Sequence, residues 1–343
     1  MDQSGNHSGA NQSEKHRPSK INGLPKSLFG YVWRASAKHQ VALCALSVAV
    51  FLLSAAPLEL QRRIVNDAIK RGALDAILWL ALAYAAVSLA EGGLKLALNV
   101  YRSWVSERSV LDLRGSVGKL TGRAAEAKDS GAAGGVEVSM MLSEVEPIGN
   151  FVGMSVSEPL LQGGVLLSVF GYLAFLEPWL ALLALGIFSP QLVFVPLMQG
   201  AINRRVERRI QTLRKVSGGI VGAAANRDPV PEREQRGRLE RVFALNMGVY
   251  KLKFSMNFLM NLLHHAGVAA ALGVGGWLAV QGRIEVGTVV AFVSGLGKVN
   301  DPWRDVVNWF REMMVVRVRY GLVAEGVRAI GFGVAPAKAG VQV

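Results

Sequence analysis

Cysteine and charged residues are both scarce in this sequence. Cys44 is the single cysteine among 343 residues, which excludes an intrachain disulfide framework and a cysteine-rich metal cluster. Charged residues make up 18% of the chain and apolar residues 51%, whereas ordinary globular domains carry about 25% charged residues. Such a chain has too little polar surface to face water on all sides. We therefore expect a membrane protein.

The few charges that are present are mostly positive. Lys and Arg together number 38 against 25 Asp and Glu, which gives a formal net charge of +13. A nucleic-acid-binding protein is usually basic and polar at once, and this chain is not. We expect cationic loops gathered on one side of a lipid bilayer, and no nucleic-acid partner.

Six segments are long and apolar enough, or nearly so, to cross a bilayer, and all of them should be helices. Their approximate bounds are 41–60, 77–100, 160–176, 179–198, 258–280 and 286–309. Only Glu177 and Pro178 separate the third segment from the fourth, which predicts a helical hairpin. The sixth is the shortest and ends in the polar sequence KVND. The predicted fold class is an all-α membrane protein with six transmembrane helices.

The distribution of Lys and Arg predicts the orientation of these helices, because cytoplasmic loops carry an excess of both. The termini and the loops 99–157 and 199–254 together hold 31 of them, and the opposite side holds 5. Both termini should therefore be cytoplasmic. Residues 1–23 are polar throughout and predict a disordered tail, and 328–343 form a C-terminal tail. The Ala-, Gly- and Arg-rich composition favours a bacterial inner membrane.

The two long cytoplasmic loops keep helical spacing of apolar residues at their ends. Val105, Val110 and Leu113 continue the second segment, and Val206 and Ile210 continue the fourth. The loop tips carry glycine and proline in KDSGAAGG, at 128–135, and in NRDPVPERE, at 226–234. We expect the membrane helices to run well past the lipid and to turn at these tips.

Four segments resemble one family, the transmembrane domain of type-1, six-helix ATP-binding-cassette exporters, over roughly residues 24–327. APLELQRRIVNDAIKRG, which contains Pro57 and Ile64–Ile69, is similar to the end of the first helix of the family. SVLDLRGSV, with Asp112, Leu113 and Arg114, is similar to the foot of the second helix. The other two are GGVEVSMMLSEVEPIGNFVG, before the third helix, and GRIEVGTVVAFVSGLGKVNDPW at 282–303, which holds Gly287, Thr288 and Pro302.

The resemblance implies an ATP-driven permease subunit that alternates between inward- and outward-open states. Six helices form half of a pathway in this family, which implies a second transmembrane subunit, either an identical copy or a paired half. The family also implies a nucleotide-binding ATPase, for which this chain carries no site. GSVGKLTG at 115–122 holds a Gly-Lys pair, but Leu113, which precedes it, stands where a P-loop needs its first glycine, and Leu120 stands where it needs Ser or Thr. We expect ATP and magnesium to be bound by a separate ATPase subunit, and no cofactor, metal or catalytic residue in this chain.

The resemblance also implies short coupling helices at the loop tips, near 124–131 and 225–234, that dock into the ATPase. The candidate docking residues are Lys128, Asp129, Arg227, Asp228, Arg233 and Glu234. The alternative interpretation is a solvated charge cluster that docks nothing.

Ionisable residues within the predicted spans are the candidates for a substrate pathway, because such residues are costly in a membrane. They are Glu91, Lys95, His264 and Lys298. Glu91 and Lys95 lie four residues apart, in the order that favours a pair on one helix, so they either neutralise one another or line a watery cavity. His264 and its neighbour His265 point in different directions around a helix, which argues against a metal site.

Two alternatives to an exporter permease remain at this point. One is a non-transporting membrane scaffold or sensor, or a truncated exporter half. The other is an ion-coupled secondary transporter that uses Glu91, Lys95 and the histidine pair as a relay.

Overall fold

The computed structural model describes residues 25, 27–69, 72, 74–127, 145–224 and 231–331. Over these residues the chain is helical, and no strand occurs in them. A helix over residues 145–154 precedes α5. The labelled helices are α1 (Leu28–Leu53), α2 (Ala56–Arg63), the π-helix η1 (Ile64–Ile69), α3 (Leu74–Ala127), α5 (Ser157–Leu176), α6 (Pro178–Phe188), α7 (Gln191–Ala224), α8 (Glu232–Val280), α9 (Val286–Gly297) and α10 (Asn300–Gly331).

Five helical stretches are long and apolar enough to cross a membrane. They are Leu28–Asn66, Leu74–Ser116, Val145–Leu176, Pro178–Ser217 and Glu232–Val280. These stretches contain the first five predicted segments. The predicted all-α membrane class is thus supported.

The sixth predicted segment, 286–309, is divided between two helices. α9 has 12 residues, or about 18 Å at 1.5 Å per residue, which is too short for a hydrocarbon core of roughly 30 Å. Lys298 and Val299 separate it from α10, which begins with polar residues at Asn300 and Asp301. Six continuous spans therefore remain a prediction.

The helices extend far beyond their apolar segments, as the spacing of apolar residues predicts. α3 has 54 residues and α8 has 49, lengths of about 80 and 75 Å that exceed the hydrocarbon core more than twofold. α8 begins at Glu232, after the N-cap residue Pro231. The tip 128–135 and residues 226–230 of the other tip lie outside the described residues, as do 1–23 and 332–343.

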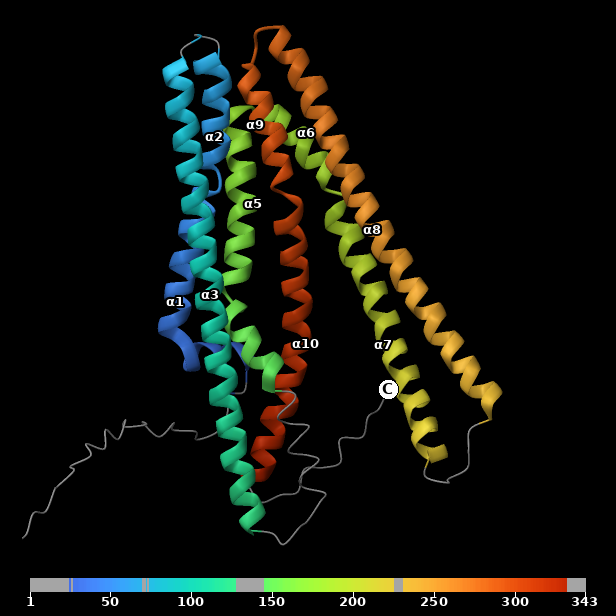
Figure 1. Cartoon of the computed structure of the whole chain (residues 1–343). Helices are drawn as coiled ribbons and strands as arrows, with labels where there is room; N and C mark the ends of the chain where they lie inside the picture. Colours follow the sequence, from blue (N-terminus) through green and yellow to red (C-terminus); the bar gives the residue numbers. More distant parts are fainter. Residues whose placement is uncertain are drawn as a thin grey trace, which may run out of the picture.

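The two ends of the molecule differ, and Figure 1 shows which segments meet at each. One end, named here the basic end, holds the ends of α3, α7 and α10 and the start of α8. The opposite end, named the turn end, holds two short connections. Each contains a glycine at positive φ, Gly72 (φ 65°) or Gly282 (φ 74°). The helix ends that border residues 128–144 and 225–230 thus share one end, as the predicted topology requires.

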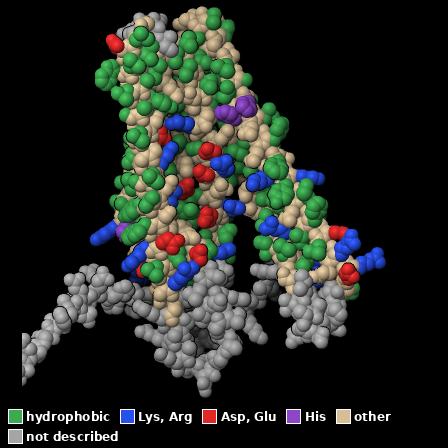
Figure 2. Space-filling view, in the orientation of Figure 1, with side chains coloured by type: hydrophobic (Ala, Val, Ile, Leu, Met, Phe, Trp, Pro, Cys, Tyr) green, Lys and Arg blue, Asp and Glu red, His purple; other side chains and the backbone are tan. Residues whose placement is uncertain are grey.

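The helices form a bundle from which one hairpin diverges. α1, α2, α3, α5, α9 and α10 stand together, whereas α7 and α8 lean away from α10 toward the basic end (Figure 1). Near the turn end, α8 packs against α9 and α6 packs against α5, and these contacts join the hairpin side of the molecule to the bundle. The space-filling view shows a gap between bundle and hairpin in the lower half of the molecule (Figure 2).

The core lies within the bundle, where α1, α5, α10 and the helix 145–154 meet. Leu43, Phe151, Leu173 and Tyr320 are almost fully buried there. A smaller apolar cluster joins α7 to α8, and Val307 of α10 packs on it. The hairpin is therefore held to the bundle mainly at the turn end, where α8 packs against α9, and it contacts α10 only sparsely.

Candidate functional site: three levels of charge in the bundle

Charged side chains gather at three levels along the bundle. Figure 2 shows acidic and basic side chains on the part of the bundle that looks toward the α7–α8 hairpin. From the turn end to the basic end, the levels are named here the turn-end network, the middle cluster and the basic-end cluster. Each joins helices that lie far apart in the sequence.

The middle cluster consists of Glu91 on α3 with Lys95 and Lys298. The Glu91 carboxylate lies 2.7 Å from the Nζ of Lys95 and 3.6 Å from that of Lys298. Glu91 is buried, at 8% exposure, whereas Lys95 is half exposed. The structure thus brings together three of the four predicted pathway residues, and it contains the predicted Glu91–Lys95 pair.

Two helix breaks position the middle cluster. The turn after α1 leaves the carbonyl oxygen of Ser54 without a helical partner, because the Leu58 amide bonds to Ala55 instead. Lys298, in the break between α9 and α10, donates a hydrogen bond to that carbonyl over 2.9 Å. Pro57, near the start of α2, contributes to the first break since it lacks an amide proton.

The remaining pathway candidate, His264, lies apart from this cluster on α8. Its ring centroid is 5.3 Å from that of His265, and His265 is the more exposed of the two. Figure 2 shows the pair on the upper part of the hairpin. Within the described residues, no group of three or more His, Cys, Asp or Glu is placed to hold a metal ion.

The basic-end cluster joins α3, α5 and α10, and the sequence reasoning missed it. Arg102 forms an ion pair with Glu158, and both side chains are 13% exposed. Arg102 also donates to Ser157 Oγ over 3.1 Å. The amide of Gln162 donates to Glu158 (2.9 Å) and to Asp305 (3.3 Å), so it bridges two carboxylates. Arg102 and Glu158 lie just outside the predicted spans, where charged residues are common. Their pairing can therefore be recognised only from the three-dimensional structure.

Two glycines allow α3 to approach closely enough to place Arg102. A Cβ added at Gly153 would lie 2.4 Å from the Arg102 carbonyl oxygen, and one added at Gly149 would lie 2.7 Å from the Val110 amide nitrogen. The spacing GxxxG predicts such close contacts between helices. At this pair of glycines the close contact is present.

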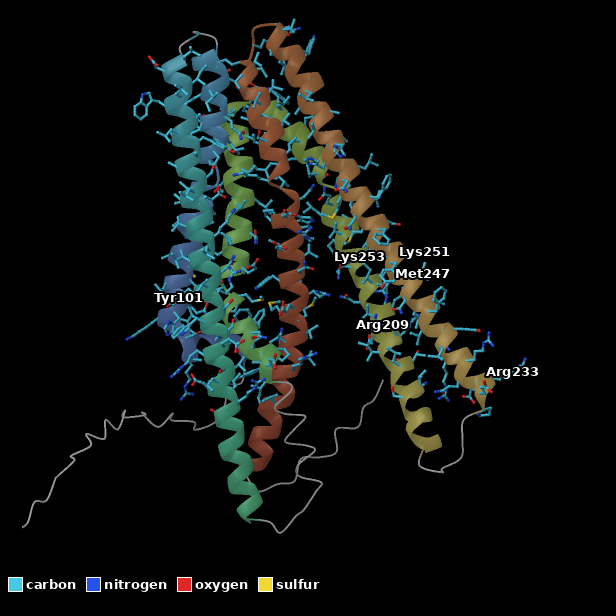
Figure 3. All side chains as sticks on the ribbon, viewed as in Figure 1. Tyr101, Arg209, Arg233, Met247, Lys251 and Lys253 are labelled. Carbon is cyan, nitrogen blue, oxygen red and sulfur yellow. The ribbon has the colours of Figure 1, made fainter. Side chains whose placement is uncertain are left out.

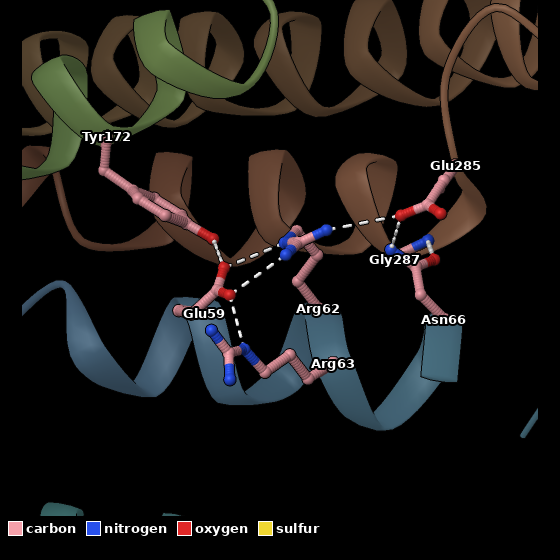
Figure 4. A network of polar contacts seen from close by, with 7 residues as sticks. All are labelled: Glu59, Arg62, Arg63, Asn66, Tyr172, Glu285 and Gly287. Carbon is pink, nitrogen blue, oxygen red and sulfur yellow. Dashed lines mark hydrogen bonds and ion pairs between the residues drawn. The ribbon is translucent and has the colours of Figure 1, made fainter. Parts of the chain in front are cut away.

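The turn-end network centres on Glu59 of α2 (Figure 4). Its carboxylate pairs with Arg62 at 2.8 Å and Arg63 at 2.6 Å, and accepts a hydrogen bond from the Tyr172 hydroxyl at 2.6 Å. Arg62 also lies 3.3 Å from a Glu285 carboxylate oxygen. These contacts join α2 and α5 to the start of α9.

Asn66 extends the network to the first turn of α9. Its amide nitrogen donates to Glu285 over 2.5 Å, and its oxygen accepts from the Gly287 amide over 2.6 Å. An N-terminal helix amide that lacks a helical partner is thus satisfied by another helix. A Cβ at Gly287 would lie 2.5 Å from both Asn66 Oδ1 and the Arg62 carbonyl, so this position has no room for a side chain.

The structure describes two of the six candidate docking residues, and both lie at the basic end. Arg233 is exposed near the start of α8 (Figure 3). Glu234 forms an ion pair with Arg238 at 2.7 Å. The other four, Lys128, Asp129, Arg227 and Asp228, lie outside the described residues.

No known protein family model matches the chain, and no curated protein matches it. The function is therefore argued from the geometry described above and from the resemblance of the four segments. Chemically, the three levels offer paired charges within apolar helices. Such groups can hold polar parts of a solute, or hold helices in one of two arrangements.

Proposed function

We propose that this chain is the permease subunit of an ATP-driven exporter. It supplies half of a pathway across the membrane and alternates between inward- and outward-open states when a separate ATPase engages its basic end. A second transmembrane subunit supplies the other half. The ATPase binds ATP and magnesium, and the basic end faces the cytoplasm.

The observation that carries this proposal is the diverging α7–α8 hairpin beside three levels of paired, partly buried charge. Asn203 and Arg311 form the one side-chain hydrogen bond between α7 and α10 in the described residues, at 3.4 Å. Separation of α7 and α8 from α10 therefore breaks few contacts. Movement of this hairpin would change access to the polar levels, which is what alternating access requires.

A second argument comes from the segments that carry the resemblance, because they touch in pairs. Asn66, in the first segment, bonds to Gly287, in the last. Arg114 of the D-L-R stretch lies 2.7 Å from Glu146, in the segment before α5. The four segments therefore meet as two pairs, the first with the last and the second with the third, which is compatible with the resemblance.

The ion-coupled transporter remains the second candidate, and the middle cluster favours it. Discontinuous helices around ionisable groups near the membrane centre are typical of secondary transporters. Glu91 and Lys298 meet between two such breaks. No contact among the described residues specifically favours the scaffold alternative.

Reconstitution with an ATPase subunit from the same organism tests the permease proposal. The purified chain in lipid vesicles should raise ATP hydrolysis by that ATPase several-fold, and lipophilic dyes should be moved only when ATP is present. A variant whose residues 226–234 are replaced by a flexible Gly–Ser linker should lose the stimulation. The matched control replaces residues 335–340 and should keep it.

Two outcomes would decide against the permease. Full stimulation by the 226–234 variant would remove the coupling assignment. Dye or ion movement driven by a pH gradient, without ATP and abolished in Glu91→Gln, would favour the ion-coupled transporter.

A further inference from the structure

A polar cavity of about 360 Å³ lies between α7 and α8 near the basic end. Small-molecule sites typically measure roughly 300–1,000 Å³, so the space is sufficient for a small ligand. The lining holds four cations, Arg208, Lys215, Arg238 and Arg241, and one carboxylate, Glu234. The other two residues are a glutamine and a threonine, and no apolar residue contributes. This cavity is named the hairpin groove.

The walls of the hairpin groove are fixed by hydrogen bonds between the two helices. Toward the basic end, Arg238 donates to the Lys215 carbonyl oxygen over 3.0 Å. Toward the turn end, Arg209 donates to the Asn246 side chain over 3.1 Å (Arg209 is labelled in Figure 3). The groove lies between these two links and therefore has a defined shape before any ligand arrives.

The positive charge of the groove is not balanced within the described residues. Glu234 is already paired with Arg238, at 2.7 Å. Arg208, Lys215 and Arg241 form no ion pair with any described residue. Three like charges around one cavity repel one another. A bound anion would attract all three, and this attraction would offset the repulsion among them.

We propose that the hairpin groove binds a ligand with several phosphate groups. Two arginines supply planar pairs of N–H donors that match phosphate oxygens, and a lysine adds a point charge. Only charged and polar residues line the groove, which favours an anionic ligand over a hydrophobic one, so this site is distinct from the proposed solute pathway. The inference stands whether or not the chain is a permease.

The position of the groove along α7 favours a soluble phosphate compound over a lipid headgroup. The apolar run of α7 ends near Met198, and Arg208 follows ten residues later, or about 15 Å along the helix. The headgroup layer is only about 5–8 Å thick on each side of a bilayer. Measured along the helix, the groove therefore lies beyond that layer.

Binding of sodium tripolyphosphate to the full chain tests the site. The protein is placed in nanodiscs of phosphatidylcholine, which has no net charge, and binding is measured by calorimetry. We expect saturable binding with one ligand per chain. The variant Arg208→Gln/Arg241→Gln should bind roughly tenfold more weakly, because two charge-assisted contacts are lost.

A matched control removes two cations from the same hairpin outside the groove. Arg236→Gln/Lys251→Gln changes the net charge equally at exposed positions, and it should bind like the original chain. Equal weakening of both variants would mean diffuse attraction and would overturn the proposal. The absence of saturable binding would overturn it as well.

A third variant keeps the test valid if loss of the two arginines disturbs folding. Glu234→Gln removes the carboxylate from the groove and should tighten tripolyphosphate binding, by roughly threefold. Unchanged or weaker binding by this variant would contradict the site.

Nanodiscs that contain phosphatidylglycerol distinguish the two sources of phosphate. If anionic headgroups reach the groove, they will compete, and tripolyphosphate will bind less tightly to the original chain than in phosphatidylcholine. The same two lipid compositions are compared for the variant Arg236→Gln/Lys251→Gln, in which the groove is intact. If the affinity of both proteins for tripolyphosphate is the same in the two lipids, the site binds soluble phosphate compounds, as its distance from the apolar run of α7 favours.

Discussion

Lys298, between α9 and α10, donates a hydrogen bond to the carbonyl oxygen of Ser54, between α1 and α2, over 2.9 Å. Two interruptions 244 residues apart in the sequence therefore lie at the same level of the bundle. Glu91 holds Lys298 from a third helix. Movement of α10 about its break would pull on α1 and α3, which links the gap beside the hairpin to the middle cluster.

The first prediction concerns the unequal roles of the charges in this cluster. Glu91→Gln should destabilise the protein by about 2 kcal/mol, because the two partly exposed lysines lose the carboxylate that they share. Lys95→Met should cost much less, because Lys95 is half exposed and Lys298 still faces Glu91. Thermal unfolding in detergent measures both. A larger loss for Lys95→Met would contradict the geometry.

The basic-end cluster gives a second pair of opposed expectations. Glu158→Gln should destabilise by about 3 kcal/mol, because Arg102 is then buried without its partner. Asp305→Asn should be neutral or stabilising, because Gln162 bridges its carboxylate to that of Glu158, and like charges so placed repel. The same unfolding assay compares them. Equal losses would show that the two carboxylates are not distinguished as described.

Close packing between the helix 145–154 and α3 gives the third prediction. Gly153→Ala should cost about 1–3 kcal/mol, because the new methyl group would lie 2.4 Å from the Arg102 carbonyl oxygen. Gly163→Ala on α5 is the matched control, with nothing within 4 Å of its added Cβ. That change should stabilise by about 0.5–1 kcal/mol, since alanine favours helix. Loss of stability in the control alone would refute this packing.

The fourth prediction concerns the link from Asn66 to the first turn of α9. Asn66→Ala should cost about 1–2 kcal/mol, as removal of a helix cap does, because the Gly287 amide loses its acceptor, whereas Glu285 keeps Arg62. Asn257→Ala, at an exposed position on α8, is the control and should change little. Hydrogen exchange should also rise specifically at the start of α9. Unchanged exchange there would mean that Asn66 does not cap this helix.

The sequence predicted the helices well because helical periodicity is a local signal. The length of α3 followed from Val105, Val110 and Leu113, and the tight link between α5 and α6 followed from Glu177 and Pro178. The break at Lys298 was not predicted, although Pro302, four residues later, lacks the amide proton that would bond to the Lys298 carbonyl in a continuous helix.

The candidate site was predictable only where its members share a helix. Glu91 and Lys95 lie four residues apart, so their pairing follows from helix geometry. Arg102 and Glu158 are 56 residues apart, and their pairing depends on how α3 packs against α5. Such contacts need the fold, and so does the uncompensated charge of the hairpin groove.

The distance between α8 and α10 at the basic end tests the central claim most directly. The native cysteine is first removed by Cys44→Ala. Leu239→Cys and Val318→Cys then provide two exposed positions for spin labels. Electron spin resonance in nanodiscs would compare the chain alone with the chain bound to its ATPase and a trapped ATP analogue. The proposal predicts a shift of several ångströms on ATP trapping. An unchanged distance distribution, with the ATPase bound, would contradict it.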